Sequence, residues 1–137
     1  MKVLVSDKMD EAGIDIFKNQ AGIEVDVNTG LSAEELQSII GAYDALAIRS
    51  ATKVDKALLD AAVNLKVIAR AGIGLDNVDI DEATRKGVAV MNTPGGNTVT
   101  TAEHAIAMMM ALTRNIPRAT ASMKAGKWEK KLLQGRE

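Results

Sequence analysis

Two arginines stand where a sequence of this kind places anion-binding groups. Arg49 and Arg70 each follow directly after a short apolar run, and Ser50 comes next to the first of them. An arginine side chain presents a planar fork of N–H donors that matches a carboxylate or a phosphate. The alternative is a structural ion pair at each position, for Arg70 with Asp76 or Asp79, and spacing alone leaves both interpretations open.

A glycine-containing turn follows Arg70, with the sequence Ala71, Gly72, Ile73 and Gly74. Glycine lets a ligand approach the backbone closely and accepts a positive φ. Successive N–H groups in such a turn can form a concave anion site. Asn77 stands where a dinucleotide fingerprint would have its third glycine. We therefore interpret the turn as a carboxylate or phosphate site and not as a pyrophosphate loop.

Composition limits the classes of function. The 137 residues are 47% apolar, 26% charged and 2% aromatic, with a formal net charge of −1 and no cysteine. This balance disfavours nucleic-acid binding, and the lack of thiols excludes disulfides and thiolate metal sites. The single histidine, His104, makes a histidine metal centre or a Ser/His triad improbable, and we expect it to be buried in a helix. The start of the chain has no signal-peptide pattern, so we expect a cytoplasmic protein.

The elements that must position these residues alternate along the first two thirds of the chain. Apolar runs predict strands at 3–5, 24–28, 45–48, 67–69 and 88–91, with helices between them at 10–20, 32–40, 55–62 and 79–86. This alternation is typical of a parallel sheet with helices on both faces, and we predict the flavodoxin-like α/β order 2-1-3-4-5. Ligands bind such sheets at the carboxyl ends of the strands. Ser6, Asp7, Arg49 and residues 70–74 should then line one crevice.

The C-terminal third has a different character. From Val99 to Leu112 the chain is apolar almost all round, which a helix tolerates when most of its sides are buried. Pro117 marks a kink or a new helix. We predict that two chains form a homodimer through the segment from Val99 to Met123, with a centre formed by Ile106, Met109 and Met110. The competing outcome is that this helix folds back onto its own sheet.

Four segments together resemble a known family. They are IRSATKV at 48–54, ARAGIGLDNVD at 69–79, VMNTPGGN at 90–97 and ATASMKAGKW at 119–128. In this order they are similar to the NAD-dependent D-2-hydroxyacid dehydrogenases, and the last is most similar to the phosphoglycerate branch. The resemblance extends over the chain from Lys2 onward.

The resemblance implies that two parts of the chain have different roles. Residues 1–97 correspond to a substrate-binding domain, and residues 98–137 to the linking helices that open the nucleotide-binding domain. Arg49 and Arg70 would face the anionic groups of a substrate such as 3-phosphoglycerate, and the backbone from Ala71 to Gly74 would hold its carboxylate. Asn97 would lie near the substrate and the nicotinamide.

The chain also departs from the family pattern. The glycine fingerprint for NAD is missing, and so are the family's catalytic Arg, Glu and His, to which His104 does not correspond. The expectation is therefore an N-terminal fragment with no catalytic residue, no metal and no NAD site of its own, inactive by itself, within an enzyme that uses NAD. The alternative function is a stand-alone module that binds small anions without redox chemistry.

Overall fold

The computed structural model describes residues 1–136, and the chain divides into two compact units, Met1–Gly96 and Asn97–Glu137. This boundary lies one residue before the expected one. The elements of unit 1 are β1 (Lys2–Val5), α1 (Glu11–Lys18), β2 (Glu24–Val27), α2 (Ala33–Ile39), the 3-10 helix η1 (Ile40–Ala42), β3 (Ala45–Ile48), α3 (Lys56–Ala61), β4 (Val67–Arg70), α4 (Ile80–Arg85) and β5 (Ala89–Met91).

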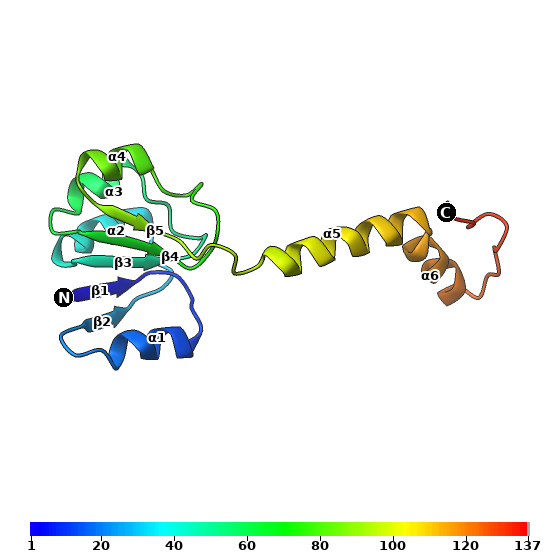
Figure 1. Ribbon diagram of the computed structural model, residues 1–137, viewed down its shortest axis with the longest axis horizontal. Helices are drawn as coiled ribbons and strands as arrows, with labels where there is room; N and C mark the ends of the chain where they lie inside the picture. The colour runs from blue at the N-terminus through cyan, green and yellow to red at the C-terminus, as the bar shows by residue number, and fades with distance from the viewer. Residues whose placement is uncertain (137) are drawn as a thin grey trace. The chain divides into compact units, whose positions relative to one another are not determined.

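Unit 1 is built on one five-stranded sheet in the order β2-β1-β3-β4-β5, with every neighbouring pair parallel (Figure 1). The predicted strand order is confirmed. The register places Ile48, the last residue of β3, opposite Arg70, the last residue of β4. The segments that follow β3 and β4 therefore leave the sheet side by side at its carboxyl edge.

The two faces of the sheet bury different sets of apolar side chains. Helices α2, α3 and α4 cover one face, where Leu4, Leu46 and Ile68 pack against their side chains. On the other face Val5 and Ala47 pack against Phe17 of α1. Because the strands of a parallel sheet are covered on both sides, their sequences are apolar runs without alternation. This burial fixes the strands that carry the turns at the carboxyl edge.

Polar side chains cap the helices that leave this edge. The side chains of Asp10, Ser32, Asp55 and Asp79 accept hydrogen bonds from the first turns of α1, α2, α3 and α4. At α2 Ser32 and Glu35 form a capping box, because Glu35 in turn accepts from the Ser32 amide at 2.8 Å. Each cap satisfies a free N–H and so fixes where the preceding turn ends.

Unit 2 consists of α5 (Thr98–Thr113), α6 (Ile116–Lys124) and the segment that follows. Pro117 lies in the first turn of α6, as one of its two predicted roles requires. No residue of α5 is buried within the chain, and its pairing with a second chain stays a prediction. His104 is exposed as well, so its expected burial is wrong. Within residues 1–136, none of the helices combines the length and the apolar character needed for a membrane crossing.

Candidate anion-binding site

The turn after β3, residues 49–52 (the β3 turn), is held by one buried carboxylate. Asp7 lies two residues after the end of β1 and is 5% exposed. Its Oδ2 accepts hydrogen bonds from the backbone amides of Arg49 (2.7 Å), Ala51 (3.2 Å) and Thr52 (3.1 Å). Its Oδ1 accepts from the Thr52 hydroxyl at 2.6 Å, and Ser6 Oγ lies 2.8 Å from the same hydroxyl. Both carboxylate oxygens are thus committed to the β3 turn.

The carbonyl groups of the same turn are held from the opposite side. The Arg49 carbonyl accepts from Arg70 Nε at 3.1 Å and from Asn77 Nδ2 at 2.8 Å. Asn77 Nδ2 also donates to the Thr52 carbonyl at 2.7 Å. Asn77 belongs to the turn after β4, residues 71–77 (the β4 turn). The β3 turn is consequently bonded through its N–H groups to β1 and through its C=O groups to β4 and the β4 turn.

The ionisation of Asp7 reflects this arrangement. Burial of the carboxyl raises its pKa, but the hydrogen bonds from the hydroxyl and amide of Thr52 and from the amides of Arg49 and Ala51 outweigh burial and lower the pKa below its ordinary value. The group is therefore a carboxylate at neutral pH. A charged acceptor makes stronger hydrogen bonds than a neutral one.

Arg49 and Ser50 lie at the exposed surface of the β3 turn. One guanidinium nitrogen of Arg49, Nη1, donates to the Lys8 carbonyl at 3.3 Å. A guanidinium has five N–H donors, so the other N–H groups of Arg49 remain available for a ligand. The side chain is tethered to the chain after β1 and still able to bind an anion.

Arg70 is placed differently, with its side chain 10% exposed. It lies across the β4 turn, where Nη1 donates to the Gly74 carbonyl and lies 3.6 Å from Asp76 Oδ1. The structure therefore brings Arg70 to the expected edge, in the Asp76 ion pair that was the alternative to ligand binding. A direct contact of Arg70 with a ligand stays a prediction.

The first four residues of the β4 turn, 71–74, offer fewer free amides than their number suggests. The Ala71 amide donates to the Ile48 carbonyl and the Gly72 amide to the Arg70 carbonyl, both at 2.9 Å. Among residues 1–136 no acceptor faces the amides of Ile73 and Gly74, which follow one another and can bind a ligand oxygen. Both glycines have negative φ, so the turn does not need a left-handed glycine. A Cβ at Gly74 would lie 2.8 Å from Asp76 Oδ1 and 3.0 Å from Arg70 Nη1. Glycine is therefore favoured at this position because these two side chains lie close to the backbone.

The loop after β5 closes the other side of the β4 turn. Asn92 Nδ2 donates to the Ile73 carbonyl at 2.8 Å, and the Thr93 amide donates to the Gly72 carbonyl at 3.0 Å. Asn97 lies outside this unit, as the N-cap residue of α5, and makes no capping bond with its side chain. Its place near a substrate stays a prediction.

Asp7 and Asn77 are the two residues whose roles the sequence interpretation missed. Asp7 is assigned there to the crevice wall and not to the support of the β3 turn, and Asn77 is noted for its place in the glycine pattern. An acid close to the end of a buried strand is a signal for Asp7, because a carboxylate that is buried there needs several hydrogen-bond donors. For Asn77 the signal is an amide side chain in a turn beside a neighbouring strand end, which is common and therefore weak.

The residues of the β4 turn do not fit a dinucleotide. Asn77 occupies the place of the third glycine, which a dinucleotide loop needs for close packing of its helix on the strand, and its side chain is bonded to the β3 turn. Among residues 1–136 there is also no group of three or more His, Cys, Asp or Glu placed to hold a metal ion. Binding of a small organic anion at these residues stays a prediction.

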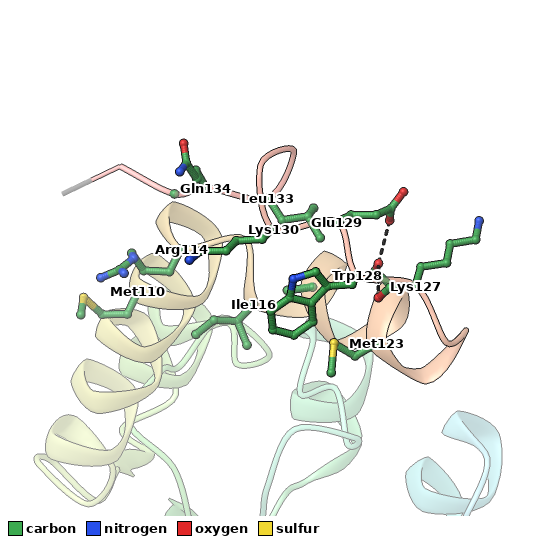
Figure 2. Close-up of a pocket in the computed structure, with 13 residues that line it drawn as sticks. Met110, Arg114, Ile116, Met123, Lys127, Trp128, Glu129, Lys130, Leu133 and Gln134 are labelled. Atoms are coloured by element: carbon green, nitrogen blue, oxygen red, sulfur yellow. Dashed lines mark hydrogen bonds between the residues drawn. The ribbon is translucent and has the colours of Figure 1, made fainter.

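Two cavities lie apart from the free donors of the site. In unit 2 a cavity of about 1010 Å³ lies between α5, α6 and the segment after them, lined by Met110, Arg114, Met123 and Trp128 among others (Figure 2). In unit 1 a cavity of about 420 Å³ lies behind the β3 turn, beside Asp7 and Thr52. Of the residues predicted to line the crevice, Ser6 and Asp7 line this second cavity, whereas Arg49 and residues 70–74 line neither cavity.

Comparisons with known proteins agree with one another. The family model of the D-isomer specific 2-hydroxyacid dehydrogenase catalytic domain matches residues 3–133. The chain is 53% identical to D-3-phosphoglycerate dehydrogenase of Archaeoglobus fulgidus over 137 residues, which are 100% of this chain and 26% of that protein. It is 47% identical to hydroxypyruvate reductase of Thermotoga maritima, covering 99% of this chain and 44% of the relative.

A solved structure points in the same direction. The NAD+-bound 3-phosphoglycerate dehydrogenase of Entamoeba histolytica superimposes with a TM-score of 0.71 at 34% identity, over 83% of this chain and 39% of that one. The chain thus spans between about a quarter and less than half of the length of these proteins.

Proposed function

The chain belongs to the D-isomer specific 2-hydroxyacid dehydrogenase family, and on that premise we propose that it is the substrate-binding part of a D-3-phosphoglycerate dehydrogenase. Such an enzyme oxidises 3-phosphoglycerate to 3-phosphohydroxypyruvate in serine biosynthesis, in the cytoplasm. Residues 1–97 would bind the substrate, and residues 98–137 would begin the nucleotide-binding part. The NAD of the reaction would be held by residues other than those of the anion site.

The observation that carries the proposal is the pairing of two different anion-binding groups at one sheet edge. The exposed Arg49 guanidinium belongs to the β3 turn, and the free amides of Ile73 and Gly74 belong to the β4 turn bonded to it. 3-Phosphoglycerate has two anionic groups, a carboxylate and a phosphate. A guanidinium fork and a pair of N–H groups match one each, whereas a 2-hydroxy acid whose carboxylate is its sole anionic group would leave one of them unused.

The test is a titration of the 137-residue chain with 3-phosphoglycerate, followed by amide NMR. We expect weak binding, in the millimolar range, with shifts at Ile73, Gly74 and Arg49. Changing Arg49→Ala should weaken binding by roughly ten- to hundredfold, because a hydrogen bond to a charged group contributes about 1.5–3 kcal/mol.

The matched control is Arg85→Ala, at the end of α4. It removes the same charge, and its partner Glu82 keeps a second cation, Lys56, at 3.5 Å. Affinity of the control should equal that of the unmodified chain. Absence of shifts at Arg49, Ile73 and Gly74 at saturating 3-phosphoglycerate would contradict the proposed function.

A further inference from the structure

We propose that Asp7 is a positioning residue for the anion site: its carboxylate fixes the β3 turn in the conformation that presents Arg49 to the ligand. The inference rests on the proposed function and extends it to a residue that touches no substrate. Asp7 lies beneath the turn and is 5% exposed. Its carboxylate accepts hydrogen bonds from the turn.

Asp7 is hydrogen-bonded to most of the β3 turn. Three of the four residues of the turn are bonded to it, Arg49 and Ala51 through their amides and Thr52 through amide and hydroxyl, with lengths between 2.6 and 3.2 Å. Of the hydrogen bonds that backbone amides donate to Asp7, the shortest, at 2.7 Å, comes from Arg49 itself. Without an acceptor at this place, three partly buried N–H groups would lack their partner, and the turn would have to rearrange to satisfy them.

The position of the turn matters because Arg49 is its exposed ligand-binding group. Its side chain makes one bond, to the Lys8 carbonyl, so the backbone of the turn sets where the guanidinium starts from. Small displacements of a binding group lose much of its contribution, since charge-assisted hydrogen bonds depend on distance and angle. Asn77 holds the carbonyls of the turn but leaves its N–H groups to Asp7.

An asparagine can take over most of this role. In Asp7→Asn the remaining side-chain carbonyl oxygen can occupy the place of Oδ2 and accept the three hydrogen bonds from the backbone amides. The new NH₂ group would face the Thr52 hydroxyl, which can then accept from it and donate instead to Ser6 Oγ, 2.8 Å away. Asp7→Ala offers no acceptor. The pair of variants therefore separates the loss of an acceptor from the loss of a charge.

The experiment compares Asp7→Ala, Asp7→Asn and the control Asp44→Ala in the 137-residue chain, by titration with 3-phosphoglycerate and by amide NMR. Asp44 is a matched control, because its carboxylate accepts the Lys2 amide (2.8 Å) and Lys66 Nζ (2.7 Å) at the amino edge of the same sheet. We expect Asp7→Ala to weaken binding roughly tenfold or more and to shift the amides of the β3 turn. Asp7→Asn should stay within about threefold of the unmodified chain, and Asp44→Ala should keep full affinity.

Two results would overturn the inference. One is a folded Asp7→Ala chain that binds as tightly as the unmodified chain, and the other is an equal loss in Asp44→Ala, which would tie affinity to general stability. Should Asp7→Ala fail to fold, Asn77→Ala takes its place, because it releases the carbonyl side of the same turn and should weaken binding while sparing the fold. An unmodified chain that binds no 3-phosphoglycerate instead contradicts the proposed function, so the two failures are distinguishable.

Discussion

Asp7 is buried and still ionised, and four donors from one turn are the reason. Its pKa is lower in the folded chain than in the unfolded chain, so the folded state binds the proton less readily. The resulting stability is present above the unfolded pKa and is lost as the pH falls through the folded pKa. The conformation of the β3 turn therefore depends on the charge of the buried Asp7 carboxylate.

This linkage predicts a pH-dependent effect of Asp7→Asn on stability. At pH 7 the variant should unfold about 1–2 kcal/mol more easily, because charge-assisted hydrogen bonds become neutral ones. Below about pH 4 the difference should shrink, because Asp7 takes up a proton first in the unfolded chain and, at still lower pH, in the folded chain as well. Urea unfolding of both chains at pH 7 and pH 3 measures this, and a difference of the same size at both values would contradict the prediction.

The residue types of the site follow from the sequence, but their contacts do not. The two arginines are found at adjacent strand ends because apolar runs of parallel strands reveal where each strand stops. What the pattern could not separate is the exposed Arg49 from Arg70, which lies against its own turn. That difference depends on the positions of Gly74 and Asp76, which spacing alone does not fix.

At the scale of elements, the sequence determines the sheet well. Each predicted strand of unit 1 is found with ends within about two residues, the usual uncertainty of element boundaries. Continuous apolar runs and four capping residues account for this agreement. The 3-10 helix η1 is not predicted, because three residues are too few to show a period.

Alanine substitutions at the two glycines of the β4 turn should have different effects. A Cβ at Gly74 would press on Arg70 Nη1 and Asp76 Oδ1, whereas a Cβ at Gly72 would meet the Arg70 guanidinium at 3.6 Å, an ordinary contact. The crowded atoms are ends of flexible side chains, so Gly74→Ala should fold, with a loss of about 1–3 kcal/mol typical of overpacking. It should also weaken binding of 3-phosphoglycerate by displacing the turn.

Gly72→Ala is the matched control for that variant, with the same added methyl group and nearly unchanged stability and affinity. Thermal unfolding and the same titration measure both quantities. Equal effects of the two substitutions would show that crowding against Arg70 does not govern the turn.

At the scale of the whole molecule, the chain should not behave as a dehydrogenase by itself. The anion site proposed for the described residues is not a dinucleotide loop, because Asn77 stands where such a loop needs glycine. We expect no saturable NAD binding and no turnover of 3-phosphoglycerate by the 137-residue chain. Calorimetric titration with NAD and an assay of NADH formation measure these, and micromolar NAD affinity would contradict the expectation.

The helix α5 gives the last prediction, because its apolar side chains are uncovered within the chain. Met109 is 59% exposed, and Ile106 and Met110 are exposed as well. Covering a side chain of this size contributes about 1.5–3 kcal/mol, so a few of them rival the ~5–15 kcal/mol stability of a domain. Large apolar patches seldom stay in contact with water on a monomer. We therefore expect two chains to pair through the segment from Val99 to Met123.

Light scattering at tens of micromolar chain measures this pairing, and Met109→Lys should shift the population to monomer, because a buried charge without a partner is costly. Ile16→Lys is the control: it places the same charge on a 73% exposed residue of α1, outside the predicted interface, and should leave the dimer intact. A well-dispersed monomer that Met109→Lys does not change would instead favour the competing outcome, in which α5 covers its apolar side chains within one chain.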